Sequence, residues 1–433
     1  MNAQTGRKKQ PNSTPSMNTF QHDTIAALRR EIHAHPELGF EEARTSDLVA
    51  AKLKQWGVPI HLGMAKTAVI GVVQGRDGGA SGRAIGLRAD MDALPVQEQN
   101  TFAHASQHPG VMHACGHDGH TAMLLAAAQQ LAATPQAERP FDGTVYLIFQ
   151  PAEEGRGGAV AMVEEGLFTR FPMQAVFGMH NWPGIPVGAM AASPGPVMAG
   201  GATFKITLRG KGAHAAMPHL GVDPMVVACH LVPALQTIVS RNKRPIDTAV
   251  LSVTLMNGGE ATNVIPDTCT IEGTVRAFSV EMFDLVERRM RSLAENISAA
   301  FEAQAEVEFL RRVGPVINHS RETLMARQVI EAIVGKANTW EQEPAMPSED
   351  FAFMLDVKEG CYVFIGNGEG AHREPGHGEG PCMLHNPSYD FNDALIPIGA
   401  AYWQGLVQAC LGAEPQNPRT GNSGPRCNQL LGA

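Results

Sequence analysis

The chain has 433 residues and a formal net charge of −9, with 44% hydrophobic and 18% charged residues. This length predicts two or three domains, and the composition is typical of a soluble globular protein. The acidic balance, without a basic stripe, argues against nucleic acid as the main partner. No apolar run reaches the roughly 18 residues that a membrane span needs.

The two ends of the chain are poor in core-forming residues. Residues 1–18 lack the apolar stretch of a signal peptide and predict a disordered lead, and residues 414–433 predict a loose tail. The seven cysteines show no close pairing, which does not indicate a disulfide framework in a chain of this length. We therefore expect a cytoplasmic protein.

Strand and helix patterns alternate through residues 19–197. Helical periodicity covers residues 25–38, 44–57 and 120–134. Short apolar runs predict buried strands at residues 67–75, 83–90, 143–150 and 174–180. This alternation predicts an α/β domain with a largely parallel or mixed sheet that helices cover.

The pattern changes over residues 198–316. It predicts, in order, a strand, a helix, two strands, a helix and a strand, at residues 201–210, 223–241, 248–259, 268–278, 279–301 and 305–313. The order β-α-β-β-α-β is typical of a ferredoxin-like α+β domain. The α/β pattern resumes over residues 317–413. We therefore expect a discontinuous first domain, residues 19–197 and 317–413, with a second domain inserted into it.

Ionisable residues lie repeatedly just beyond the predicted strands of the first domain. They are Asp90, Asp92, Glu153, Glu154, His180 and His385, and Cys115 and His117 precede a predicted helix. The carboxyl ends of strands in open α/β sheets meet at one crevice, where ligands bind. Each signal alone has an ordinary explanation as a cap, a core residue or a solvated pair, whereas their conjunction favours a metal site.

The residue types agree with metal chemistry. Cys115 and His117 share a face if their segment is extended, and the following helix N-terminus favours a thiolate at Cys115. Thiolate, imidazole and carboxylate together suit zinc or a similar transition metal. Of the adjacent Glu153 and Glu154, one can bind metal while the other acts as a general base toward water. Five candidate ligands exceed the four of a closed zinc site, which favours two metals.

These motifs, in this order, resemble the aminoacylase–carboxypeptidase family of dinuclear metallohydrolases. The amidohydrolase branch, with hippurate hydrolase, N-acyl-amino-acid amidohydrolases and plant indole-acetyl-amino-acid hydrolases, is the nearest in pattern. The matching segments are "HAHPELGFEE", "LRADMDALPVQE", "MHACGHDGHTAML", "FQPAEEGRGGA", "GMHNWPGIPVG", "GKGAHAAMPH", "NVIPD", "GTVRAF", "SEDFA" and "LHNPSYDFND". They span residues 33–393, almost the whole chain.

The resemblance implies a catalytic domain of the zinc-exopeptidase type, an inserted ferredoxin-like lid and a set of site residues. The implied metal ligands are Cys115, His117, Glu154, His180 and His385, with Glu153 as general base. The wider family places His-x-Asp after its early strand, whereas this chain has Asp90 and Asp92 there. The resemblance makes Cys115 the bridging ligand, and we expect both aspartates to orient ligands. His33, His35, His113 and His120 are expected to be structural.

The inserted domain resembles the family's lid and dimerisation domain. His214 matches a histidine that polarises the scissile carbonyl, often from a partner subunit, and Asn263 and Arg276 match groups that hold the substrate's carboxylate. A tetrahedral oxyanion needs a hydrogen-bond donor, and an arginine grips a carboxylate with two parallel bonds. The resemblance implies a homodimer or homotetramer formed through the lid.

The expected activity is hydrolysis of the amide bond of N-acyl-L-amino acids, including hippurate-like substrates, to a carboxylate and a free amino acid. It implies two divalent cations per subunit; the thiolate favours zinc, and manganese, cobalt and nickel stay open. One alternative is a dipeptidase, a carboxypeptidase or an N-acetyl-amino-acid deacetylase of a biosynthetic pathway. Another is a non-catalytic metal-binding relative, which would be expected to lack the base or a ligand.

Overall fold

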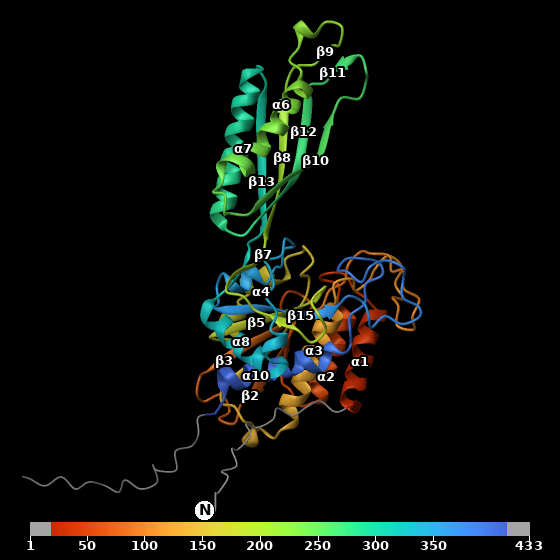
Figure 1. Ribbon diagram of the computed structural model, residues 1–433, viewed down its shortest axis with the longest axis vertical. Coiled ribbons are helices and arrows are strands. Elements are labelled where there is room, and N and C mark those ends of the chain that lie inside the picture. The colour runs from red at the N-terminus through yellow and green to blue at the C-terminus, as the bar shows by residue number, and fades with distance from the viewer. Residues whose placement is uncertain (1–18, 414–433) are drawn as a thin grey trace, which may run out of the picture.

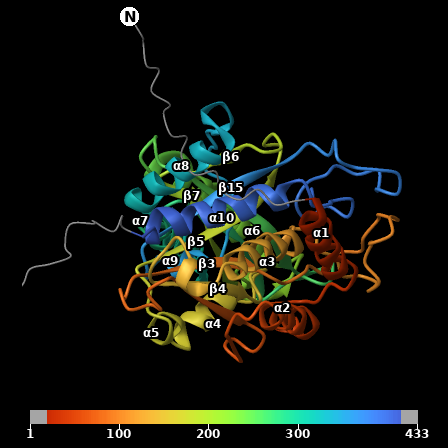
Figure 2. The same cartoon turned by 90° about the horizontal axis from the view of Figure 1, so that it is seen from below.

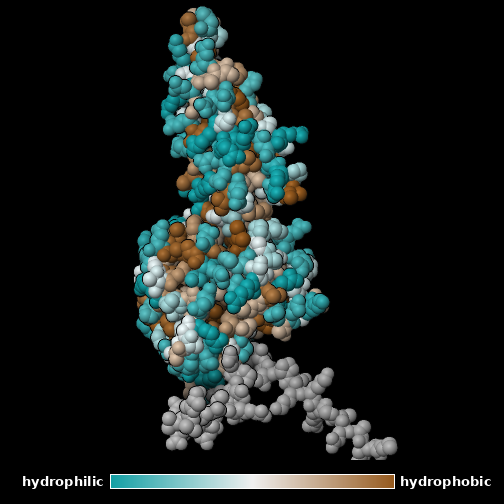
Figure 3. Space-filling view, turned by 90° about the vertical axis from the view of Figure 1, so that its left-hand side faces the viewer, coloured by the Kyte–Doolittle hydropathy of each residue, from teal (hydrophilic) through white to brown (hydrophobic). Residues whose placement is uncertain are grey.

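The computed structural model describes residues 19–413 and has a broad lower domain and a narrow upper one (Figures 1 and 3). The predictions for residues 1–18 and 414–433 fall outside the described residues. Within the described part, no helix is both long and apolar enough to cross a bilayer.

The lower domain is built on a seven-stranded sheet in the order β1-β2-β4-β3-β5-β15-β6. The strands are β1 (Ile60–Leu62), β2 (Val69–Gln74), β3 (Ala84–Asp90), β4 (Thr144–Gln150), β5 (Ala175–Pro183), β6 (Met190–Ala191) and β15 (Gly360–Gly368). The four central strands β4, β3, β5 and β15 are parallel, and the outer strands are antiparallel to their neighbours. Both faces of β3 and β15 are buried, as parallel strands between helices require. The predicted mixed α/β sheet is confirmed.

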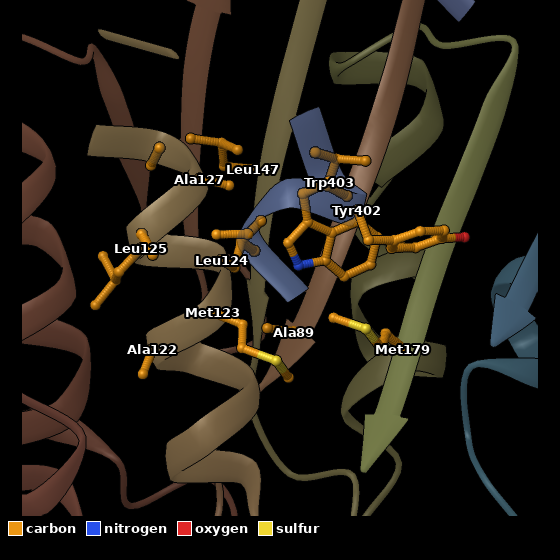
Figure 4. Packing of buried hydrophobic residues seen from close by; sticks show 14 of the residues in the cluster. Ala89, Ala122, Met123, Leu124, Leu125, Ala127, Leu147, Met179, Tyr402 and Trp403 are labelled. Atoms are coloured by element: carbon orange, nitrogen blue, oxygen red, sulfur yellow. The ribbon is translucent and has the colours of Figure 1, made fainter. Parts of the chain in front are cut away.

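Helices cover both faces of this sheet. One layer holds α1 (Thr19–Ala34), α2 (Ala43–Gln55), α3 (His117–Ala133), α8 (Ser320–Val334) and α10 (Leu395–Leu411); the other holds α4 (Gly158–Glu164), α5 (Leu167–Arg170) and α9 (Ala352–Leu355). Figure 2 shows α3 and α10 side by side within the first of these layers. In Figure 4, Met123 and Leu124 of α3 pack near Trp403 of α10 and Met179 of β5. Each such buried side chain contributes about 1.5–3 kcal/mol, so this packing holds the start of α3 firmly against the sheet.

The upper domain has the chain order β8–α6–β10–β12–α7–β13 and the sheet order β10-β12-β8-β13. Its elements are β8 (Gly200–Arg209), α6 (Pro224–Thr237), β10 (Ala249–Gly258), β12 (Thr268–Ala277), α7 (Val280–Ala300) and β13 (Gln304–Val313). Buried and partly exposed residues alternate along β12, because only one face of the sheet packs against the two helices. This is the ferredoxin-like arrangement that the sequence predicts.

Two chain segments join the domains and pair with each other as β7 (Gly195–Met198) and β14 (Val316–Asn318). A Cβ atom on Gly200 would lie 2.8 Å from the backbone nitrogen of Pro315, so only glycine lets the segments pass this closely. At the opposite end, β9 (Ala213–His214) and β11 (Val264–Ile265) form a small antiparallel pair at the tip.

Candidate metal centre

The candidate ligands come together at the carboxyl ends of the central strands. Asp90 ends β3, Glu153 and Glu154 follow β4, His180 lies on β5, and Cys115 and His117 stand at the start of α3. The candidate ligands form two groups, and within each group the donor atoms lie within 4.8 Å of one another. One group is Cys115, His117 and His180, and the other is Cys115, Glu154 and His385. The structure therefore brings together all five residues that the resemblance marks as ligands, with Cys115 in both groups.

The segment that carries Cys115 is a tight turn and not the extended stretch that the sequence suggests. Gly116 has φ +91°, and helix α3 begins at His117. A Cβ on Gly116 would lie 2.3 Å from Asn181 Nδ2 and 2.4 Å from the Tyr389 hydroxyl. The Asn181 amide donates to the Cys115 carbonyl at 2.7 Å, which fixes the turn. Cys115 and His117 thus face one centre because glycine reverses the backbone between them.

Two imidazole rings are oriented by their Nδ1 atoms. His117 Nδ1 lies 3.3 Å from Asp92 Oδ1, and His180 Nδ1 donates to the Asn181 carbonyl at 2.5 Å. This leaves the Nε2 atom of each ring facing the donor group, with His180 Nε2 3.4 Å from Cys115 Sγ. Such outer hydrogen bonds select the tautomer of a metal-binding histidine.

The donor set fits divalent cations. His117 Nε2 is buried and has no hydrogen-bond partner among the described residues, although such an atom normally has one. Burial and the nearby charges of Glu154 and Glu153 raise the pKa of the Cys115 thiol well above its usual value. The predicted effect of the helix N-terminus on that thiol is therefore outweighed, and a thiolate at Cys115 needs a cation beside it.

The adjacent carboxylates Glu153 and Glu154 point in different directions. Ala152 before them has φ +56°, an unusual backbone for alanine, and its N–H donates to Glu42 Oε1 at 2.8 Å. Glu154 Oε1 lies 3.2 Å from His385 Nε2, whereas Glu153 Oε1 accepts the backbone N–H of Asp350 at 3.3 Å. Burial raises the pKa of Glu153 well above its usual range, and the charges of Glu349 and Glu154 add to the effect.

Asp90 and Asp92 are saturated by hydrogen bonds. Asp92 accepts the backbone N–H groups of Glu153 at 3.0 Å and Glu154 at 2.9 Å. Asp90 lies 2.6 Å from His120 Nδ1, and His120 Nε2 accepts the backbone N–H of Asn181 at 2.9 Å. Asp90, His117 and His120 are also close enough to hold an ion. The atoms of Asp90 and His120 are already used, which favours a supporting role for both.

His33, His35 and His113, the remaining histidines of the segments "HAHPELGFEE" and "MHACGHDGHTAML", do not belong to the donor group. His33 is buried between Asp118 and Glu98; although burial disfavours its charge, these carboxylates raise its pKa to about 10. His113 is also buried, and burial lowers its pKa to about 4. His35 packs edge-on against His108.

The structure places two of the three candidate residues of the upper domain together and the third apart from them. His214 lies on β9 at the tip, and there the Asn263 carbonyl accepts the backbone N–H of Ala215 at 3.0 Å. In Figure 1, β9 is at the end of the upper domain away from β5 and α3. Arg276 lies near the base of β12, opposite Gly201. Among the described residues its guanidinium donates only to the Val275 carbonyl, at 3.2 Å, and forms no ion pair.

The sequence did not identify the residues whose hydrogen bonds hold the site residues in place. They are Glu42, Arg88, Gln150, Asn181, Glu349, Asp350 and Tyr389. One signal was available: Arg88 interrupts the apolar residues of β3 two positions before Asp90, and a fully buried charge requires partners. The identity of those partners depends on the tertiary fold.

Comparison with known proteins agrees with this geometry. A profile of peptidase family M20/M25/M40 matches residues 86–409, more than half of the chain. The chain is 40% identical to a hippurate hydrolase of Campylobacter jejuni over 382 residues, 88% of this chain and 94% of that protein. It is 39% identical to an N-acetyl-L-cysteine deacetylase of Bacillus subtilis, over 91% of this chain and 89% of that one. A crystal structure of a dinuclear metal-binding peptidase from Bacillus subtilis superposes with a TM-score of 0.78 at 33% identity, covering 91% and 99% of the two chains.

Proposed function

The chain belongs to peptidase family M20/M25/M40, and from this we propose that it cleaves the amide bond of N-acyl-L-amino acids with the aid of two divalent cations. The family acts on amide bonds, which makes this protein an amidohydrolase. The acyl amino acid is the part that we propose. The observation that carries it is the convergence of five metal-type donors beside a buried carboxylate, that of Glu153.

In the proposed site, Cys115, His117 and His180 would hold one cation, and Cys115, Glu154 and His385 would hold the other. Bound divalent cations would polarise the scissile carbonyl and make water more acidic at neutral pH. The thiolate favours zinc, and manganese, cobalt and nickel are the alternatives.

Glu153 is the proposed general base. Its carboxylate takes a proton from the attacking water and returns it to the nitrogen of the leaving amine. Glu153 is 8% exposed, and this burial shields the transferred proton from bulk solvent. Asp92 keeps the backbone of this residue in place through the N–H of Glu153.

The upper domain is proposed to complete the site from a second subunit. His214 belongs to β9, at the tip of the upper domain, whereas the donor group of the same chain lies in the lower domain (Figure 1). We therefore assign it to the site of a partner in a homodimer or homotetramer, where its imidazole steadies the oxyanion. Asn263 lies next to His214 at the tip, so we assign it to the same partner site.

We place the protein in the cytoplasm, because the cysteines in residues 19–413 are all free.

Arg276 is proposed to bind the α-carboxylate of the substrate, because its guanidinium has no ion-pair partner among the described residues. Replacing it with methionine should raise KM for an N-acyl amino acid about 10–100-fold, the loss expected for a charge-assisted hydrogen bond of about 1.5–3 kcal/mol. The same variant should leave KM for the corresponding C-terminal amide nearly unchanged. Steady-state kinetics on the two matched substrates measure both effects.

The matched control for this variant is Arg209→Met, which removes an exposed arginine of β8 in the same domain. If the unsubstituted enzyme hydrolyses the acid and its C-terminal amide with equal kcat/KM, carboxylate recognition is not part of its specificity. An equal rise in KM for both substrates would likewise remove Arg276 from that role.

A further inference from the structure

Arg88 is a fully buried arginine beneath the candidate metal centre. It lies on β3 and is 1% exposed. Its Nε donates to Gln150 at 2.8 Å, Nη1 to Asp90 at 2.6 Å, and Nη2 to Glu349 at 2.9 Å and Asp350 at 3.2 Å. Burying a charge costs several kcal/mol unless it is paired and hydrogen-bonded throughout, as it is here. The guanidinium therefore fixes the relative positions of these four side chains.

Asp350 is held at both carboxylate oxygens. Oδ1 accepts from Arg88 and from Gln150 Nε2, the latter at 2.8 Å, and Oδ2 accepts the backbone N–H of Ala159 at 2.8 Å. These three donors come from β3, β4 and the start of α4, so Asp350 is tied to three separate elements. Its own backbone N–H is consequently fixed in direction.

That backbone N–H points at Glu153. The distance from Asp350 N to Glu153 Oε1 is 3.3 Å, and this is the one hydrogen bond that the Glu153 carboxylate accepts among the described residues. Glu153 also belongs to two close groups of ligand-type atoms, one with His117 and Glu154 and one with Glu349 and Asp350. Its carboxylate therefore lies between the candidate ligands and the Arg88 network.

We propose that Asp350 is a positioning residue, which sets the orientation of the Glu153 carboxylate through its backbone N–H while Arg88 and Gln150 hold it in place. This inference rests on the proposed function, in which Glu153 is the general base. The backbone of Glu153 is anchored separately, by Asp92. Without the Asp350 carboxylate, the backbone of Glu153 would stay in position, but its side-chain carboxylate would no longer be held in one orientation.

The test is the Asp350→Asn variant. A carboxamide has one accepting oxygen, so its NH₂ group must face either Arg88 and Gln150 or the Ala159 N–H, and a donor meets a donor in both orientations. We expect kcat to fall about 10–100-fold, because misplacing a catalytic group by about 1 Å costs about 100-fold. KM and the bound metal per subunit should change little, whereas the buried contact between two donors should lower the melting temperature without preventing folding. The split between kcat and KM distinguishes positioning from loss of structure.

Two further variants separate hydrogen-bond geometry from charge. Glu349→Gln removes one charge from the same network, but its oxygen still accepts from Arg88 and its NH₂ can donate to the Tyr362 hydroxyl. Its loss of kcat should be at least about tenfold smaller than that of Asp350→Asn. Asp356→Asn, an exposed position directly after α9, is the matched control and should keep wild-type kcat.

Wild-type kcat in a folded, metal-loaded Asp350→Asn enzyme would overturn the inference, as would equal losses in Asp350→Asn and Glu349→Gln. If Asp350→Asn does not fold, Gln150→Glu replaces it, because the new carboxylate still accepts from Arg88 Nε but faces Asp350 without a donor. Its kcat should fall similarly, and wild-type kcat would overturn the inference. Glu153→Gln is assayed in parallel. If that variant is inactive while Asp350→Asn is normal, only the positioning role fails; if it is fully active, the proposed base itself is wrong.

Discussion

Glu153→Gln should keep its bound metal and lose nearly all turnover, with kcat about 10²–10⁴-fold lower, the usual contribution of a general base. The substitution is nearly isosteric, and the amide oxygen of glutamine can still accept the Asp350 N–H that Glu153 Oε1 accepts. What disappears is the basic oxygen that takes the proton from water. The measurement pairs kcat on an N-acyl amino acid with the metal content per subunit.

Glu164→Gln is the matched control for that experiment. Glu164 is exposed at the end of α4, so the same change of charge there should leave both quantities at the wild-type level. Turnover near wild type in metal-loaded Glu153→Gln would show that another group takes the proton. A variant that loses metal together with activity would place Glu153 among the ligands.

Cys115→Ser should remove both cations together and lower kcat/KM by at least about 100-fold. Cys115 is the residue common to the two ligand groups, one with His117 and His180 and one with Glu154 and His385. A serine hydroxyl is shorter, harder and far less acidic than a thiol, so it does not replace a bridging thiolate at neutral pH. Metal content per subunit, measured after dialysis at several metal concentrations, reports the loss directly.

A second variant makes this prediction specific to the bridge. His180 belongs to only one of those two groups, so His180→Ala should weaken the binding of one cation and leave the other bound. Cys229→Ser, an exposed thiol on α6, is the control for the chemical change. Full occupancy by two cations in Cys115→Ser would show that Cys115 does not bridge them.

Much of the candidate centre follows from local sequence. The apolar runs of β3, β4 and β5 lead into Asp90, Glu153 and His180 respectively, and parallel strands bring their carboxyl ends to one edge. This is why the sequence indicates a cluster of candidate ligands at that edge, and the family resemblance then selects five of them. The short outer strands β1 and β6 were not predicted, because two or three residues carry no periodic signal.

The support for the centre depends on contacts between distant parts of the chain. Asp350 reaches Glu153 across 197 positions, and the string "SEDFAFML" does not show which neighbours it meets. The pKa of the Cys115 thiol also could not be predicted from the sequence, because burial and the charges of Glu154 and Glu153 raise it and outweigh the expected effect of the helix N-terminus. The left-handed backbone conformation of Ala152 and His385 could not be predicted from the sequence either, because residues other than glycine adopt it only rarely.

The most direct test of the account is a substrate panel assayed on the enzyme after its metals have been removed by chelation and restored one at a time. The panel contains N-acetyl and N-benzoyl amino acids, their C-terminal amides and free dipeptides, with zinc, manganese, cobalt and nickel as the metals. We predict that the stripped enzyme is inactive and that a restored enzyme hydrolyses N-acyl amino acids in preference to the other two classes. Hydrolysis of dipeptides but of no N-acyl amino acid, or full activity without metal, would contradict the account.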